Sequence, residues 1–430
     1  MTVTGDLLDF AAGHHRLPDG VRAAALMLLS DTLAVGAAGS SAPGADGVLA
    51  AASGWGAGGA VPILGRDLRL PAAAAAFVNA YQIHALEWDA VHEAAVVHAM
   101  SVVTAAVHAA CHSPCYGAEI DRVAALTALV VGVEIACGLG IAADTPLRFF
   151  RPATAGTIGA ALACARLAGL PRERFGDVLG LAHAQCAGTM QAHVEGSLAL
   201  PLQVAAAARA AITAVDLVVA GLPGPHDALM GEFGYFPMFD GGDPTAMVAT
   251  LGSVWRTPEI SVKPWPSGRA SHATLAAIAR AGSEEITAIT AEVPPLVARL
   301  VGRPWLAEMT PAYARLCLPF LTALMLRDGR IDPRFFTADS FGDPLLRALG
   351  DRLTIVVDGN PDPNALSPQR FALTLAGGRT RVIDAPATLG SPTNPLSRPA
   401  QAAKLAFARS LARVTPVTDD PFMLLCGSDR

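Results

Sequence analysis

The sequence predicts a mainly α-helical protein, with a large all-helical domain and a smaller α+β lid domain inserted before the C-terminal helix. Hydrophobic residues make up 52 % of its 430 residues and aromatic residues only 6 %, and alanine, the best helix former, dominates the apolar residues. Apolar segments with helical spacing fill roughly the first 260 residues. After Pro264-Trp265-Pro266, stretches with Ile and Thr suit strands instead.

The helical domain is predicted from a series of long apolar segments. We expect helices over residues 17–36, 70–86, 98–112, 118–142, 153–170, 172–190 and 201–220. Pro71 suits the first turn of the second helix, because no N–H donor is needed there, and short Gly, Pro and Asp breaks separate the later helices. Helices this apolar need helical neighbours on more than one side. We therefore assign this region to one all-helical unit.

The smaller domain is predicted from mixed strand and helix signals. Strands are expected over residues 285–292, 352–358, 370–375 and 379–384, and helices over 271–281, 313–327 and 344–349. Ala376-Gly377-Gly378 is a hairpin signal between the last two strands. A final Ala/Leu-rich helix over 399–414 is expected to rejoin the helical domain, so that residues 1–262 and 390–430 form that domain and residues 263–389 form the lid.

Charge and cysteine content argue against several classes of protein. The formal net charge is −6 without a basic run, which argues against nucleic-acid binding. Seven cysteines are scattered without a Cys-x-x-Cys pair, so a reducing cytoplasm suits the chain best. The N-terminus is acidic and lacks the features of a signal peptide. Residues 123–143 resemble a membrane span, but Glu134 near their centre favours a buried helix of a soluble protein without membrane contact.

The densest group of ionisable residues lies between Asn79 and Met100, in a chain with only 16 % charged residues. Three histidines and three carboxylates occur there, namely His84, Glu87, Asp89, His92, Glu93 and His98. Burial of such groups is costly, but proton-transfer enzymes place them in a dry cleft, where their pKa values shift towards neutrality. The alternative is a polar loop between two helices, with its histidines in solvent.

A second polar cluster lies at the predicted junction of the domains, from Ser261 to His272. Lys263 and Arg269 would bind substrate carboxylates, since arginine can hold a carboxylate through two parallel hydrogen bonds. The prolines of Pro264-Trp265-Pro266 limit the freedom of the backbone between them. The alternative is an exposed basic linker.

Further candidates come from three short motifs. Arg151 and Thr154 lie in a small-residue segment that could start a helix with its N-terminal amides facing an anion, although the same segment equally suits close helix packing. His193 lies in a polar interruption between two apolar helices and is kept as a substrate-binding candidate. His108 and His112 have helical spacing but no carboxylate beside them, and we expect no metal site.

Five stretches in order along the chain carry a resemblance to a known family. They are residues 79–98, Arg151 to Gly156, Lys263 to His272, Thr310 to Phe320 and Gly390 to Ser397. Together they resemble the MmgE/PrpD family, which contains 2-methylcitrate dehydratase, cis-aconitate decarboxylase and iminodisuccinate epimerase. The resemblance implies a helical domain with an α+β lid, a homodimer with its active site in the cleft between the domains, and catalysis without a metal or an organic cofactor.

The resemblance also assigns positions within the site. The acidic segment of the family, usually Asp-Phe-Asp-Asp-Thr-His, falls on Glu87 to His92, and a catalytic histidine that follows it falls on His98. The cleft lysine falls on Lys263, and the basic and imidazole positions after it fall on Arg269 and His272.

Four positions depart from the pattern of the family. Ala90 and Val91 replace an Asp and a Thr of the acidic segment, Leu200 replaces a second lysine, and Gly268 stands where the decarboxylase type has a histidine. These departures argue against a standard citrate-like pocket, and against cis-aconitate decarboxylase more than against the family.

The chemistry implied is the removal of a weakly acidic proton next to a carboxylate, followed by elimination, reprotonation or decarboxylation. The expected roles are His98 as base or acid, Asp89 and His92 as its partners, Lys263 and Arg269 as carboxylate ligands, His272 as a second proton donor, and Glu87, His193, Arg151 and Thr154 as substrate-binding residues. The leading prediction is a cofactor-independent hydro-lyase for a small hydroxy-carboxylate, similar to 2-methylcitrate dehydratase. An epimerase or isomerase using the same proton transfer, and a non-catalytic carboxylate-binding paralogue, are the alternatives.

Overall fold

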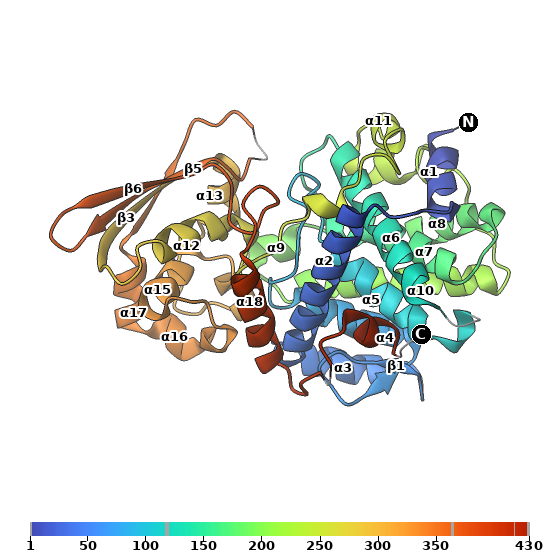
Figure 1. The fold of residues 1–430 in the computed structure, drawn as a ribbon, viewed down its shortest axis with the longest axis horizontal. Coiled ribbons are helices and arrows are strands. Elements are labelled where there is room, and N and C mark those ends of the chain that lie inside the picture. Colours follow the sequence, from blue (N-terminus) through green and yellow to red (C-terminus); the bar gives the residue numbers. More distant parts are fainter. Residues whose placement is uncertain (1, 117–119, 363–364, 417, 428–430) are drawn as a thin grey trace.

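A large helical lobe and a smaller α+β lobe make up the computed structural model, which describes residues 2–116, 120–362, 365–416 and 418–427 (Figure 1). The longer helices of the large lobe are α1 (Val3–Ala12), α2 (Asp19–Ala38), α3 (Ala45–Ser53), α4 (Ala72–His84), α5 (Ala99–His112), α6 (Arg122–Ala142), α7 (Arg151–Leu167), α8 (Phe175–His183), α10 (Ala199–Val219) and α18 (Arg398–Ser410). The shorter ones are α9 (Gln191–Glu195), α11 (Thr245–Val248) and α19 (Pro421–Cys426). The predicted mainly α class is confirmed.

Small residues allow the central helices of the large lobe to pack closely. Gly132 of α6 faces Gly159 of α7, and a Cβ atom on Gly159 would lie 2.3 Å from the carbonyl oxygen of Gly132. Glu134 of α6 is fully buried, but the backbone N–H groups of Arg256 and Thr257 each donate to its carboxylate at 2.7 Å. The charge in the middle of this apolar helix is therefore satisfied inside the core.

Three helices of the described chain are long and apolar enough to cross a membrane by length and composition. They cover Asp19–Ser41, Arg122–Ala142 and Ala199–Val219, and 67, 89 and 56 % of their most apolar windows is buried inside the protein. Much of their apolar surface thus already packs against other helices.

The small lobe contains a four-stranded mixed sheet, β3 (Ile286–Val293), β4 (Leu353–Val357), β5 (Gln369–Leu375) and β6 (Thr380–Ala385), in the order β4-β3-β5-β6. Its helices include α12 (His272–Ala279), α13 (Pro295–Val301), α14 (Pro311–Ala314), α15 (Leu318–Asp328), α16 (Ala338–Gly342) and α17 (Pro344–Gly350). The strands β5 and β6 are antiparallel, as the hairpin signal predicts, and Gly377 and Gly378 in their turn have φ values of +87° and +82°. The lobe has an apolar core of its own.

Besides helices such as α1 and α3, which the sequence prediction did not include, three differences between prediction and structure bear on the architecture. A short antiparallel pair, β1 (Val61–Pro62) with β2 (Arg69–Leu70), interrupts the region predicted to be all-helical. The helix expected over 172–190 ends at His183. The helix expected over 313–327 is divided into α14 and α15, because Pro319 lies in the first turn of α15 and lacks the N–H needed to continue a preceding helix.

The chain crosses between the lobes twice, and the two crossings run side by side. The N–H of Val262 donates to the carbonyl oxygen of Gly390 at 2.9 Å. Gly390 has a φ of +91°, and a Cβ atom there would lie 2.0 Å from the carbonyl oxygen of Val262. After the second crossing, α18 packs along α2 at the centre of the molecule (Figure 1). The prediction that the final helix rejoins the helical region agrees with this packing.

A buried ion pair anchors α18 to the large lobe. Lys404 Nζ lies 2.7 Å from the Asp31 carboxylate, and both side chains are almost completely buried. We expect Lys404→Met to lower the free energy of unfolding by about 3–5 kcal/mol, because it leaves the Asp31 charge buried without its partner. Urea denaturation followed by circular dichroism measures the free energy of unfolding. The double variant Asp31→Leu, Lys404→Met should lose clearly less stability, and an equal or larger loss would contradict the ion-pair explanation.

Candidate active site

The loop between α4 and α5 forms one wall of the candidate site. Backbone pairing between Val91 and Ser261 fixes the loop against the first crossing between the lobes, and pairing between His92 and Val97 closes the loop on itself. Glu87 and Val96 both have a φ of +53°, which is a strained value for residues with a Cβ atom. Each left-handed residue lies two positions before an ionisable residue, Glu87 before Asp89 and Val96 before His98, so the strain falls where the ionisable residues gather.

Asp89 is the centre of the site. Its Oδ2 atom lies 2.8 Å from Nδ1 of His84 and 3.0 Å from Nδ1 of His98, and it also accepts a hydrogen bond from the hydroxyl of Ser101. The imidazole rings of His84 and His98 meet edge to face, with their centroids 4.8 Å apart. Each ring turns Nδ1 towards Asp89, which leaves Nε2 on its other side. One buried carboxylate thus orients two histidines.

Lys263 lies on the first crossing between the lobes, and its side chain extends to the cluster around Asp89. Its Nζ atom donates to both the carbonyl oxygen and the carboxylate of Glu87, each at 3.0 Å, and lies 3.9 Å from Oδ1 of Asp89. The left-handed backbone of Glu87 turns its two acceptors towards the same ammonium group. A lysine has three N–H donors, so one remains beyond the two that Glu87 accepts.

Burial and neighbouring charges shift the pKa values of these groups in different directions. Burial lowers the pKa of His98, and the nearby Asp89 carboxylate offsets this only in part. Burial acts in the same direction on His84, but Asp89 and Glu87 outweigh it and raise the pKa of His84. Burial would raise the pKa of Glu87, yet Lys263 and the imidazoles lower it to about 2. The site therefore favours a neutral His98 beside a protonated His84.

The opposite pKa shifts of His98 and His84 predict a bell-shaped dependence of kcat/KM on pH. His98 has a pKa below its ordinary value, so its basic form is lost only when the pH falls below about 6.5. His84 has a raised pKa, so its acidic form is lost only above that pH. We expect a plateau that includes pH 6.5, with midpoints that belong to the coupled pair. Steady-state rates measured from pH 4 to 10 check this, and an acid midpoint above 6.5 would contradict the assignment.

A cavity opens beside this group and has walls from both lobes. His84, His98 and Lys263 line it together with apolar residues of the large lobe, such as Phe150, and of the small lobe, such as Leu316. It encloses about 110 Å³. The protein thus offers a proton-transfer group inside a small, largely apolar space.

Several of the predicted site residues meet in this cavity. The structure brings together Glu87, Asp89, His98, Lys263, Arg269, Arg151 and His193, all of which line the cavity except Asp89, which lies directly behind it. Arg269 is bound by protein groups, with its guanidinium 2.7 Å from Glu93 and donating to the carbonyl oxygen of Leu389 at 2.6 Å. Arg151 is paired with Asp240 at 2.9 Å. Their roles as substrate ligands stay predictions.

Three other predicted residues do not reach the cavity. His92 Nε2 lies 2.9 Å from the carboxylate of Glu259 rather than beside Asp89. His272 is completely buried, with Nε2 3.1 Å from the Ser267 hydroxyl. Thr154 is buried in α7, and its hydroxyl lies 3.3 Å from that of Tyr235. These positions suit support of the fold better than contact with a substrate.

The sequence interpretation gave no role to two residues that complete the site. His84 belongs to the ionisable stretch and lies at the end of a predicted helix, five residues before Asp89, so its spacing was a usable signal. Glu93 also belongs to the stretch, but its pairing with Arg269 spans 176 positions and has no sequence signal.

The atoms of His84, Asp89 and His98 are close enough to be considered as metal ligands, since one ligand atom from each lies within 4.8 Å of the others. A metal requires neutral imidazoles and deprotonated ligands. Here Asp89 and Glu87 favour the protonated form of His84, and Lys263 brings a further positive charge. The donor set therefore suits a shared proton better than a metal ion.

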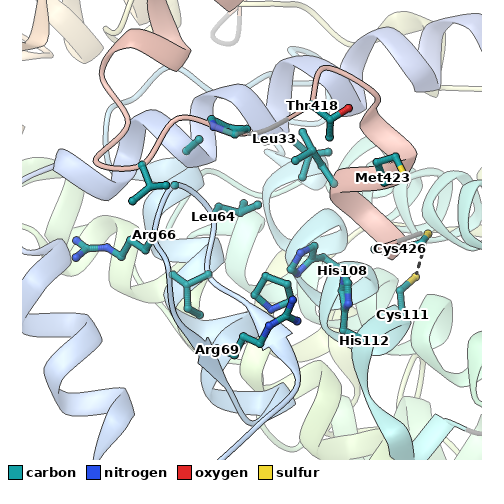
Figure 2. Close-up of a pocket in the computed structure, with 18 of the residues that line it drawn as sticks. Leu33, Leu64, Arg66, Arg69, His108, Cys111, His112, Thr418, Met423 and Cys426 are labelled. Atoms are coloured by element: carbon teal, nitrogen blue, oxygen red, sulfur yellow. Dashed lines mark hydrogen bonds between the residues drawn. The ribbon is translucent and has the colours of Figure 1, made fainter. Parts of the chain in front are cut away.

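A second cavity, of about 720 Å³, lies under α19 in the large lobe. Figure 2 shows His108 and His112 on α5 facing it, close to Cys111 and Cys426. Burial lowers the pKa of His112 to about 4 and holds the pKa of His108 well below its ordinary value. Two neutral imidazoles do not form an acid and base pair, so the smaller cavity between the lobes is the candidate active site.

A helical lobe and an α+β lobe meet at two imidazoles that lie beside one buried carboxylate. The chain belongs to the MmgE/PrpD family. Residues 6–247 match the MmgE/PrpD N-terminal domain and residues 265–419 match the MmgE/PrpD C-terminal domain. The family expected from the sequence is thereby confirmed.

Several curated relatives of this chain are named after the same reaction, the decarboxylation of cis-aconitate. The chain is 27 % identical to human cis-aconitate decarboxylase over 354 residues, which cover 77 % of this chain and 71 % of the relative. It is 31 % identical to the cis-aconitate decarboxylase-like protein oryM of Aspergillus oryzae over 262 residues, or 57 % of this chain and 54 % of the relative. For the cis-aconitate decarboxylase of Aspergillus terreus the identity is 30 % over 260 residues, and the shares are 57 and 53 %. The chain thus spans about half the length of the two fungal relatives.

Proposed function

We propose that this protein is a lyase that acts on a small carboxylate, and specifically a hydro-lyase that removes water from a hydroxycarboxylate. The observation that carries the proposal is that the buried Asp89 lies within 3.0 Å of Nδ1 of both His84 and His98, with Lys263 beside it. Burial lowers the pKa of His98, whereas the nearby carboxylates raise that of His84. An elimination of water needs a base for the C–H proton and an acid for the leaving hydroxide. His98 and His84 supply that combination.

The proposed step balances within these groups. His98 Nε2 removes the proton from the carbon next to the substrate carboxylate, and the electron pair of that C–H bond moves towards the carboxylate. The remaining N–H of Lys263 stabilises the charge that develops there. The electrons then form the carbon–carbon double bond while the C–O bond breaks, and His84 Nε2–H protonates the departing hydroxide to give water.

Carboxy-lyase activity is the second candidate, and the names of the relatives favour it. Loss of carbon dioxide needs no base to begin the reaction, but it needs an acid to protonate the carbon that remains. The protonated His84 would serve this reaction, and His98 would then be less important.

The experiment that separates the candidates is proton NMR of the purified protein with hydroxy- and amino-dicarboxylates and tricarboxylates, including cis-aconitate, in deuterated water. A new vinyl signal from a hydroxycarboxylate identifies the hydro-lyase. Release of carbon dioxide from an unsaturated acid identifies the carboxy-lyase. Deuterium exchange at carbon without a new product identifies an epimerase. Binding without any change in the spectra would replace the proposal with a non-catalytic carboxylate-binding protein.

We also propose, from the family resemblance, that the protein acts as a cytoplasmic homodimer without a metal or an organic cofactor. Analytical ultracentrifugation tests the dimer. Activity that survives prolonged dialysis against a chelator tests the independence from metal.

A further inference from the structure

The wall of the candidate active site is apolar over most of its area. Beyond the ionisable group, the cavity is lined by side chains such as Leu147, Phe150, Met190, Leu200, Leu300 and Leu316. They come from both lobes, so the apolar wall faces the ionisable group from several sides. Because the cavity encloses only about 110 Å³, a substituent of a bound molecule has to lie directly against this wall.

The cationic side chains of the cavity already have carboxylate partners within the protein. Lys263 pairs with Glu87 at 3.0 Å, Arg269 with Glu93 at 2.7 Å, and Arg151 with Asp240 at 2.9 Å. Asp89 balances the protonated His84 in the same way. Positive and negative charges are therefore matched before a substrate enters.

This charge balance disfavours a substrate with three carboxylates. Each added carboxylate would have to displace an internal pair or lie near Glu87 and Glu93, and an unpaired charge in an apolar space costs several kcal/mol. The spare N–H of Lys263 serves one carboxylate, and Arg269, which also lines the cavity, is a further cationic donor. An alkyl arm, in contrast, gains free energy by leaving water for the apolar wall.

We propose that the substrate is a hydroxycarboxylate with no more than two carboxylates and with an apolar arm that packs against the wall around Leu200. This inference rests on the proposed lyase function and adds the chemical class of the substrate. The specificity then comes from an uncharged wall that rejects a third carboxylate.

A matched pair of substrates tests the proposal. Citrate and 2-isobutylmalate have the same hydroxyl group, the same reacting protons and nearly the same shape, but an isopropyl group replaces one terminal carboxylate of citrate. We expect kcat/KM for 2-isobutylmalate to exceed that for citrate by about a hundredfold or more, because several kcal/mol separate a buried charge from a buried alkyl group.

The unreactive analogues, tricarballylate and 2-isobutylsuccinate, separate this inference from the lyase function. Their binding to the wild-type protein is measured by calorimetry. Tighter binding of 2-isobutylsuccinate supports the apolar arm even if neither substrate turns over, and in that case the lyase function alone fails. Turnover of citrate at an equal or higher kcat/KM overturns the inference and leaves the lyase function standing. Without turnover, the inference also fails if tricarballylate binds as tightly or neither analogue binds.

A pair of variants on one helix locates the effect. Leu200 is buried in the cavity wall, whereas Leu202, two residues along α10, is 40 % exposed. Leu200→Lys places a positive charge in the wall, and we expect it to shift the preference towards tricarballylate by at least about tenfold. Leu202→Lys should leave the preference unchanged.

If Leu200→Lys does not fold, Met190→Gln is used, which should reduce the affinity for 2-isobutylsuccinate. An unchanged preference in the folded variant contradicts the role of the wall.

Discussion

Replacement of His98 by Gln is expected to lower kcat by about a thousandfold or more. A general acid or base contributes about 10²–10⁴ to a rate, and His98 is the neutral imidazole of the site, with Nδ1 held 3.0 Å from Asp89 and Nε2 on the side away from it. Glutamine keeps a polar side chain of similar length but accepts no proton near neutral pH. KM should change much less than kcat, because Lys263 remains in place to bind the carboxylate.

Steady-state kinetics with the substrate identified by NMR measures this loss. His183→Gln is the matched control, since His183 is a half-buried imidazole of α8 that does not line the cavity. It should keep wild-type activity. A His98→Gln variant that retains more than a tenth of the wild-type kcat would refute the assignment of His98 as the base, and would favour decarboxylation with His84 as the only required acid.

The substitution Asp89→Asn should lower kcat by about 10²–10⁴ while the protein remains folded. The carboxylate is the acceptor that orients both imidazoles and holds the proton on His84. An amide of the same shape carries no charge, so the pKa of His84 should fall, because Asp89 is a main cause of its elevation. The alkaline limb of the pH profile should therefore move to lower pH.

The pH profile distinguishes this role from a merely structural one. Asp332→Asn serves as the control, because Asp332 is also completely buried but pairs with Arg334 in the small lobe, away from the cavity. It should change stability without moving either limb of the profile. If Asp89→Asn lost activity with an unchanged profile, loss of local structure would explain the result better than loss of charge.

The elements with long apolar segments could be predicted from the sequence, because helix periodicity is a local signal. The helix expected over 98–112 coincides closely with α5 (Ala99–His112). The strands β1 and β2 could not be predicted, because two residues are too few to show an alternating pattern. The break before α15 could have been predicted, because Pro319 lacks the N–H needed inside a helix and suits a first turn.

The same distinction applies to the site. Asp89 and His98 lie nine positions apart, and their proximity in sequence indicated a shared role. Lys263 joins them across 176 positions from Glu87. The polar cluster from Ser261 to His272 indicated Lys263 as a carboxylate ligand, but only the family resemblance placed it in the same cleft as His98. The partner of His92 is Glu259, 167 positions away, so the interpretation of His92 as a partner of His98 had no means of detecting this carboxylate. The apolar wall depends on side chains from both lobes and is a property of the folded chain alone.

The insertion of the small lobe into the large one has a consequence for synthesis on the ribosome. The helix that buries Asp31 comes from residues 398–410, so the large lobe stays incomplete until the whole small lobe has been made. The small lobe has its own apolar core, which needs no residue from the C-terminal helix. It can therefore fold first, although it is translated second. Until α18 emerges from the ribosome, the nascent chain exposes the surface of α2 that α18 later covers. Chaperones would be most needed during this stage of synthesis.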